Sequence, residues 1–158
     1  MNNTIGKQVL FAGYRDKFFE QVLTGLSNSV EPFHLAFSPS SSDDVKDIRT
    51  IYAQFLVRHE DIQLHYSDFL NDGIDASTLK ELSECRLFFN RTLDRVFLSP
   101  MTGRQSDQYF YTLVEFWISY FNKSPGIKTI FFQASPHFPW DICMFFIAKH
   151  LNIKTYIL

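Results

Sequence analysis

Residues 127–158, which read IKTIFFQASPHFPWDICMFFIAKHLNIKTYIL, decide the fold that the whole chain is expected to adopt. The run 127–133 is short, apolar and rich in β-branched and aromatic residues, which is typical of a strand. Residues 140–151 repeat apolar side chains at the spacing of one helix face, and residues 153–158 form a second apolar run. The stretch therefore predicts a strand, a loop, a helix and a second strand, with the two strands parallel and adjacent.

The loop between that strand and the helix holds the densest group of reactive side chains in the sequence. It contains Ser135, His137, Trp140 and Asp141 within seven positions. Ligands of open parallel sheets bind at the carboxyl ends of strands, and this loop leaves such an end. We therefore expect His137 and Asp141 to be catalytic, and Ser135 and Trp140 to bind substrate.

Each polar residue of the loop also has a structural explanation, and the sequence leaves both open. His137 suits a general base because imidazole titrates near neutrality, but a loop histidine between prolines can equally be structural or simply exposed. Asp141 can orient His137 or bind a hydroxyl group, but a carboxylate in the first turn of a helix also stabilises the helix. Ser135 can bind a ligand or hydrogen-bond within the loop. A hydrolase triad is not indicated, because no GxSxG motif is present.

The rest of the chain alternates segments typical of strands and of helices. Three further strands are predicted, at residues 7–13, 30–37 and 61–66. Four further helices are predicted, at residues 14–26, 43–57, about 75–98 and 107–122. This alternation predicts an α/β fold: a Rossmann-like three-layer domain with a mainly parallel five-stranded sheet in the order 3-2-1-4-5. We expect a single domain of this kind over residues 1–158.

In that strand order, the loops that follow the first and fourth strands meet at the switch point of the sheet. The loop after the first strand begins with Gly13, Tyr14 and Arg15, which we expect to bind substrate. A tight turn followed by a solvated arginine is the alternative explanation. A single glycine before bulky residues does not let a pyrophosphate approach the backbone, so a dinucleotide site is not predicted.

Composition excludes several classes of protein. The contents of 46% hydrophobic and 20% charged residues are typical of a globular chain. The net charge of −2 and the lack of a Lys/Arg cluster argue against a nucleic-acid partner. Cys85 and Cys143 lack the spacing of metal ligands, so we expect no metal and two reduced core cysteines in a cytoplasmic protein. No signal peptide or membrane span is predicted.

The last predicted strand ends in an apolar run at residues 156–158, with no helix after it to cover the sheet. A parallel strand normally continues into such a helix. We therefore expect the domain to be half of a larger protein, or to be completed by a partner.

The segment 131–158 resembles a segment of bacterial surface-polysaccharide glycosyltransferases, including capsule-polysaccharide biosynthesis proteins with the GT-B fold. In those enzymes, a proline–histidine pair, an aspartate and an A-K-x-L-x-I-x-T pattern follow the fourth strand of the N-terminal half. The matching residues of this chain are Pro136, His137, Asp141, Ala148, Lys149, Leu151, Ile153 and Thr155. The resemblance covers about the last two-fifths of the chain well, and the rest only as architecture.

The resemblance implies that the chain is the N-terminal, acceptor-side domain of a GT-B enzyme. Its ligand would be a saccharide or lipid-linked acceptor, with His137 activating or binding the acceptor, Asp141 orienting His137, and Gly13 to Arg15 forming a wall that faces the acceptor. The nucleotide-sugar donor would belong to a missing donor-binding domain or subunit, so the chain alone would be inactive and would hold no cofactor. We also expect homo-oligomers or peripheral association with the inner face of the membrane.

Two other functions remain open from the sequence. The chain can be a stand-alone α/β protein-interaction module, because residues 109–121 carry aromatic side chains on more than one helix face. It can also be a small hydrolytic enzyme that uses His137. The sugar, the nucleotide, the acceptor and the stereochemistry of transfer are not readable from the sequence.

Overall fold

The structure is a computed structural model that describes residues 8–14, 21, 33–38, 50–71, 73–96 and 101–158. The chain divides into two compact units, which are described separately. The sheet unit comprises residues 1–54, 124–135 and 153–158. The helical unit comprises residues 55–123 and 136–152.

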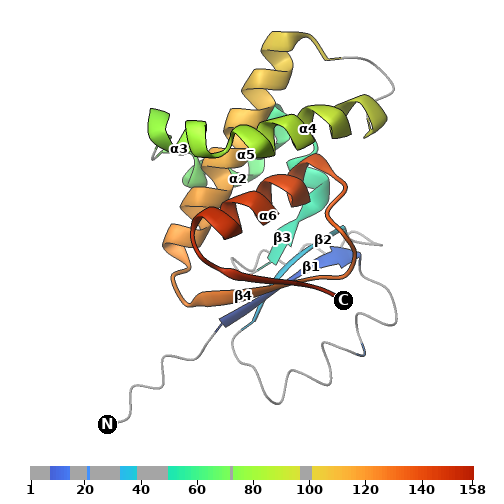
Figure 1. Ribbon diagram of the computed structural model, residues 1–158, viewed down its shortest axis with the longest axis vertical. Coiled ribbons are helices and arrows are strands. Elements are labelled where there is room, and N and C mark those ends of the chain that lie inside the picture. Colours follow the sequence, from blue (N-terminus) through green and yellow to red (C-terminus); the bar gives the residue numbers. More distant parts are fainter. Residues whose placement is uncertain (1–7, 15–20, 22–32, 39–49, 72, 97–100) are drawn as a thin grey trace. The chain divides into compact units, whose positions relative to one another are not determined.

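The sheet unit contains five parallel strands (Figure 1). They are β1 (Gln8–Tyr14), β2 (Phe33–Ser38), β3 (Thr50–Tyr52), β4 (Ile127–Phe132) and β5 (Lys154–Ile157). Neighbours in the sheet follow the order β3-β2-β1-β4-β5. The predicted α/β class with a parallel sheet is confirmed, and β4 and β5 are the adjacent parallel strands expected from residues 127–158.

The strand β1 lies inside the sheet and is apolar over its central residues. Val9, Leu10, Phe11 and Ala12 are all buried, as expected for a parallel strand with neighbours on both sides. Aromatic rings stack across three strands at one level of the register. The ring centroid of Phe131 on β4 lies 5.5 Å from that of Phe11 and 5.2 Å from that of Tyr156 on β5. These contacts add side-chain packing to the backbone hydrogen bonds.

The third predicted strand and the second predicted helix are wrong. Residues 61–66 belong to the helix α2 (His59–Tyr66), although apolar and polar side chains alternate there. Only Ile62 of that helix is buried, whereas Leu64 is 76% exposed, so the alternation does not face a core. The third strand is the short β3, which the sequence placed in a helix over 43–57, and the 3-10 helix η1 (Ala53–Leu56) follows it. Residues 43–49 lie outside the described residues, and so does the predicted helix 14–26 except for Tyr14, which belongs to β1, and Gln21.

The helical unit contains α2 and four further α-helices, which Figure 1 labels. These are α3 (Ala76–Glu81), α4 (Ser83–Val96), α5 (Gly103–Lys123) and α6 (Pro139–His150), with the 3-10 helix η2 (Ser67–Phe69) after α2. Asp75 caps α3 by accepting a hydrogen bond of 2.9 Å from the amide of Thr78. The single helix predicted over about 75–98 is divided at the buried Leu82 into α3 and α4.

The core of the helical unit is built mainly from the aromatic residues of α5. Trp117 is fully buried, and its indole Nε1 donates a hydrogen bond of 3.0 Å to the carbonyl oxygen of Trp140 in α6. The hydroxyl of Tyr109 donates a hydrogen bond of 2.7 Å to the carbonyl oxygen of Leu56. Both polar groups are thereby satisfied inside an apolar core. The ring of Trp117 contacts those of Phe116, Tyr120 and Phe121 on the same helix. The ring of Phe69, from η2, contacts those of Phe116 and Tyr120.

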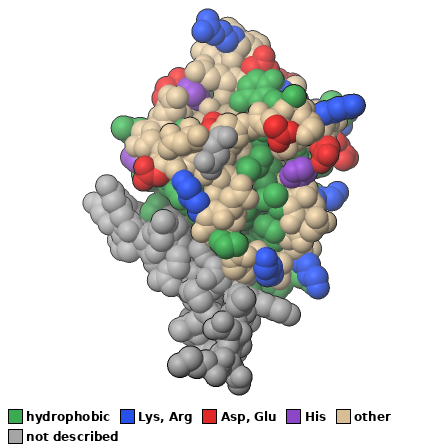
Figure 2. Space-filling view, turned by 90° about the vertical axis from the view of Figure 1, so that its left-hand side faces the viewer, with side chains coloured by type: hydrophobic (Ala, Val, Ile, Leu, Met, Phe, Trp, Pro, Cys, Tyr) green, Lys and Arg blue, Asp and Glu red, His purple; other side chains and the backbone are tan. Residues whose placement is uncertain are grey.

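Several large apolar side chains of the helical unit remain on the surface. Leu87 and Phe88 on α4 are 49% and 41% exposed, and Tyr111 on α5 is 46% exposed. Figure 2 shows a face of the molecule on which hydrophobic side chains gather between charged ones. Not all the aromatic residues of α5 are therefore used in the core.

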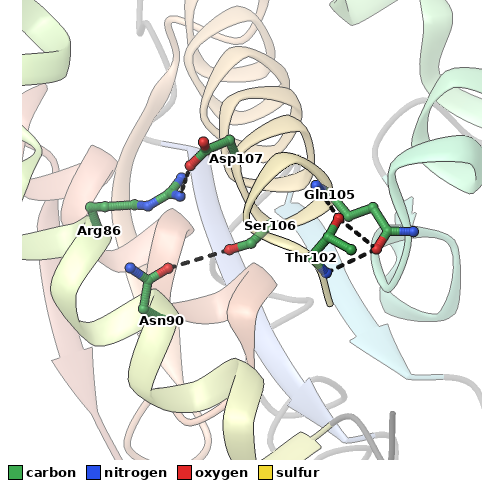
Figure 3. A network of polar contacts seen from close by, with 6 residues as sticks. All are labelled: Arg86, Asn90, Thr102, Gln105, Ser106 and Asp107. Atoms are coloured by element: carbon green, nitrogen blue, oxygen red, sulfur yellow. Dashed lines mark hydrogen bonds and ion pairs between the residues drawn. The ribbon is translucent and has the colours of Figure 1, made fainter. Parts of the chain in front are cut away.

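Polar contacts join α4 to the first turns of α5 (Figure 3). Arg86 forms an ion pair with Asp107, and the Ser106 hydroxyl lies 3.4 Å from the side-chain oxygen of Asn90. The helix α5 begins before the predicted residue 107. Thr102 and Gln105 form a capping box, in which the Gln105 side chain accepts from the Thr102 amide at 2.9 Å and the Thr102 hydroxyl accepts from the Gln105 amide at 3.3 Å.

A substitution of Gly13 tests the packing at the end of β1. The Gln133 amide donates to the carbonyl oxygen of Ala12 at 2.9 Å, which holds Gln133 against Gly13. A Cβ atom added at Gly13 would lie 2.5 Å from both Cβ and Oε1 of Gln133. We expect Gly13→Ala to lower the free energy of unfolding by about 1–3 kcal/mol, as measured by urea denaturation.

Gly103→Ala is the matched control for that substitution. Nothing lies within 4 Å of a Cβ atom at Gly103, which is the first residue of α5. Alanine has a higher helix propensity than glycine, so this variant should be as stable as the parent or more stable. Unchanged stability in the Gly13 variant would show that Gln133 does not pack against Gly13.

Candidate functional site

The sheet unit holds one part of the predicted site, at the carboxyl ends of β1 and β4. These two strands pair in parallel, and the order of strands reverses between them, so the switch point of the sheet lies there. Gly13 packs against Gln133, which directly follows β4, and Ser135 is exposed two residues later. Tyr14 is the last residue of β1, and Arg15 lies outside the described residues.

The helical unit holds the other part, in the residues that lead into α6. Phe138 is the N-cap residue and has an extended backbone, with φ of −103° and ψ of 158°. Pro139 is the first residue of α6, where the missing amide proton of proline costs no helical hydrogen bond. The sequence placed Pro139 in the loop, one residue before the helix that it in fact begins. Pro139 therefore fixes the start of α6 two residues after His137.

Asp141 uses its carboxylate to close the first turn of α6. One of its oxygens accepts a hydrogen bond of 2.7 Å from the backbone amide of Phe138. This is one half of a capping box, and the other half is not formed because phenylalanine has no side-chain acceptor. The structural role that the sequence left open for Asp141 is thus present in the helix.

The same carboxyl group has unusual acid–base properties, because Asp141 is only 6% exposed. Burial disfavours its charged form and raises its pKa from 3.8 to about 6. Hydrogen bonds from the backbone of Phe138 and His137, and the charge of the His137 side chain, act in the opposite direction and lower the pKa of Asp141. Asp141 can therefore exchange a proton close to neutral pH.

His137 is exposed, in contrast to Asp141. The imidazole ring centroid lies 4.4 Å from the ring centroid of Phe138. Because the charge of His137 influences the pKa of Asp141, the two side chains form an electrostatically coupled pair. The pair combines an accessible imidazole with a buried carboxyl group, which is an arrangement suited to taking a proton from a bound hydroxyl.

Trp140 lies almost entirely inside the protein. It is 6% exposed, and its carbonyl oxygen accepts the hydrogen bond from Trp117. Its indole contributes to the protein interior, and the structure favours a packing role for it. In the sheet unit, the structure thus places Gly13 against Gln133. In the helical unit, it places His137 near Asp141, and Trp140 lies in the core.

The structure shows a further polar cluster, around His59, that the sequence did not indicate. The Nδ1 atom of His59 lies 2.6 Å from the hydroxyl of Thr112, and its Nε2 atom lies 2.7 Å from the side-chain nitrogen of Gln108. Gln108 and Thr112 are one helical turn apart on α5, which is the only signal in the sequence for this contact. Hydrogen-bonding partners at both ring nitrogens hold His59 in one orientation, as in a structural histidine.

Two kinds of feature are absent from the part of the chain that the structure describes. Its His, Cys, Asp and Glu side chains form no group of three or more that could hold a metal ion. None of its helices has both the length and the hydrophobicity needed to cross a membrane.

Comparisons with known proteins leave the function to be argued from the site itself. No protein-family model matches the chain, and no curated protein or solved structure matches it.

Asp141→Asn should change the way in which stability depends on pH. A carboxyl group whose pKa is raised from 3.8 to about 6 binds its proton more tightly in the folded state. The free energy of unfolding therefore falls as the pH rises from about 4 to about 6, by up to about 3 kcal/mol. Asparagine removes this fall and keeps an oxygen that can accept from the Phe138 amide. Urea denaturation at a series of pH values measures the difference.

Asp75→Asn is the control with the opposite sign. Hydrogen bonds from Ser77 and Thr78 hold the pKa of Asp75 well below its usual range. Its contribution to stability is present above its ordinary pKa and is lost as the pH falls. A pH profile of Asp141→Asn that matches the parent profile would show that the pKa of Asp141 is not raised.

Proposed function

We propose that this chain is the acceptor-binding domain of a glycosyltransferase of bacterial polysaccharide biosynthesis. In this proposal it has a Rossmann-like three-layer architecture and works with a GT-B donor-binding domain or subunit that holds the nucleotide sugar. Its own ligand is a saccharide or lipid-linked acceptor. The protein acts in the cytoplasm, at the inner face of the membrane.

The coupled pair of His137 and Asp141 carries this proposal. The pair follows β4, one of the two strands at the switch point of the parallel sheet. The exposed imidazole is accessible to an acceptor, and the buried carboxyl group beside it has a pKa near 6. The resemblance of residues 131–158 to the corresponding glycosyltransferase segment includes both members of the pair. Position in the fold, chemistry and resemblance thus support the same two residues.

Sugar transfer gives each residue a defined task. An acceptor hydroxyl oxygen forms a bond to the anomeric carbon of the donor sugar, while the bond from that carbon to the nucleotide diphosphate breaks. A ring nitrogen of His137 takes the proton of the acceptor hydroxyl. The negative charge of Asp141 stabilises the imidazolium that results, because the two side chains are electrostatically coupled. Gly13 and Ser135 lie at the strand ends where the acceptor is expected to bind.

His137→Ala tests the proposal in the complete enzyme. We expect kcat/KM for transfer from a panel of nucleotide sugars to the native polysaccharide acceptor to fall about 10²–10⁴-fold, because a general base is removed. His65→Ala is the matched control, since His65 is an exposed histidine of α2 whose ring stacks on Phe55 at 3.8 Å. Circular dichroism verifies that both variants are folded. Unchanged turnover and acceptor affinity in the His137 variant would contradict the proposal.

The exposed apolar side chains of α4 and α5 favour a second candidate, a stand-alone protein-interaction module. Leu87, Phe88 and Tyr111 remain 41–49% exposed, although polar residues would be expected at solvated positions of a helix. In this case the partner would cover these side chains, and the chain would carry out no chemistry itself.

Light scattering separates the two candidates. An interaction module should form an oligomer or a complex, and the double substitution Leu87→Ser with Phe88→Ser should abolish it because the buried apolar area is lost. Leu64→Ser is the control, since Leu64 is 76% exposed on α2, away from these helices in the sequence. A sharp monomer that binds no hydrophobic dye, with or without the substitutions, would exclude the interaction module.

A further inference from the structure

Two cysteines that are distant in the sequence meet inside the helical unit. Cys85 lies on α4 and Cys143 lies on α6, and both are free and fully buried. Their sulfur atoms are 4.0 Å apart. We propose that Cys85 and Cys143 are an oxidisable pair, which closes into a disulfide between α4 and α6.

The geometry requires only a small movement to form the bond. The sulfur atoms of a disulfide are about 2.05 Å apart, so the two thiols have to approach each other by about 2 Å. Side-chain rotation and a slight shift of the helices provide movements of this size. The two helices belong to the same compact unit, so the bond needs no rearrangement of one unit against the other.

Two charged side chains influence the pair, Asp141, two residues before Cys143, and Arg86, the residue after Cys85. Its Nη2 atom is paired with Asp107, but its Nη1 atom is buried and has no hydrogen-bond partner among the described residues (Figure 3). The guanidinium group also lies over the ring of Phe110, 4.6 Å from the centroid. The side chain of Arg86 is partly exposed and already paired with Asp107, so its positive charge favours a nearby thiolate of the pair only in part.

Two opposing effects determine how fast the pair reacts. Burial, the neighbouring Cys85 and the charge of Asp141 raise the pKa of Cys143 well above its usual value, whereas the charge of Arg86 lowers the pKa of Cys143. Burial has the larger effect, so little thiolate exists at neutral pH. We therefore expect slow oxidation that proceeds through local opening of the helices, and not the rapid response of an exposed redox sensor.

With hydrogen peroxide as the oxidant, the reaction balances in two steps. The thiolate of one cysteine attacks an oxygen of the peroxide, breaks the O–O bond and forms a sulfenic acid, and the hydroxide that leaves takes up a proton to become water. The thiol of the other cysteine then attacks the sulfenic sulfur, and a second water leaves. Two thiols and one peroxide thus give one disulfide and two waters, and a dithiol reductant reverses the change.

The bond would join the helix of the candidate site to its neighbour. His137 and Asp141 lie just before and within the first turn of α6, the helix that carries Cys143. The two cysteines are 58 positions apart in the sequence, so the bond closes a long loop and strongly restricts the unfolded chain. The oxidised protein should therefore be more resistant to unfolding, with α6 tied to α4.

The test oxidises the full chain with a small excess of hydrogen peroxide and stops the reaction with an alkylating reagent. The intact mass of the monomer should fall by about 2 Da, which is the loss of two hydrogens, and peptide mapping should find a bond between residues 85 and 143. The melting temperature should rise by about 10 °C, and dithiothreitol should reverse both changes. Cys85→Ala and Cys143→Ala should show neither change.

The parent protein alone is sufficient to overturn the proposal, in case a cysteine variant fails to fold. Cysteines that end as separate sulfinic acids, that form bonds between two chains, or that remain unmodified after prolonged treatment would each contradict it.

The role of Arg86 is tested by a separate measurement. Arg86→Gln should slow the oxidation several-fold at fixed pH, because the positive charge is lost. Arg91→Gln, which removes an exposed arginine of the same helix, should leave the rate unchanged.

Discussion

The structure depends on the hydrogen bonding of β1 to a strand on each side. A buried strand needs a partner for every backbone amide and carbonyl, and β1 finds these partners in β2 and β4. Parallel strands cannot be joined by a tight turn, so the chain between β1 and β4 has to cross over. That connection contains α2 to α5, and the connection between β4 and β5 contains α6. The helical unit is therefore built entirely from crossover segments of the sheet.

This arrangement explains why the candidate site lies where one strand ends and a helix begins. The loop after β4 must leave the sheet and start α6 within a few residues, and Pro139 and Asp141 both serve that start. A carboxylate that caps a buried helix end loses its water, which raises its pKa. The pKa of Asp141 is thus raised because the residue caps the buried end of a helix. His137 lies near Asp141 because the loop before α6 is short.

The segments that were predicted best are those whose ends are marked by residues that start or stop helices. Pro136 lies before α6, Pro139 is its first residue and Asn152 follows it. Asn152 adopts the left-handed conformation, with φ of 57°, that ends helices. The alternation at 61–66 was misleading, because a period of two carries information only where one face is buried, and Leu64 is not buried. The strand β3 has only three residues, too few to show any period.

The candidate site was predictable in part, for the same reasons. His137 and Asp141 are close in the sequence, so a helix start between them was enough to place them together. The contact of Gly13 with Gln133 and the meeting of Cys85 with Cys143 join residues far apart in the sequence. Such contacts depend on strand register and helix packing, which a single sequence does not reveal. The raised pKa of Asp141 likewise results from burial in the folded protein.

The position of β1 has a consequence for the synthesis of the protein. Val9 to Ala12 leave the ribosome before β4, their partner on one side, which is made on the order of ten seconds later at ordinary rates of translation. During that interval an apolar strand has an unpaired edge, which can pair with another nascent chain. The helical segments made in the meantime form local contacts quickly, but they do not supply the missing hydrogen bonds. The edge of β1 that pairs with β4 in the folded protein therefore has no partner strand until translation has passed β4.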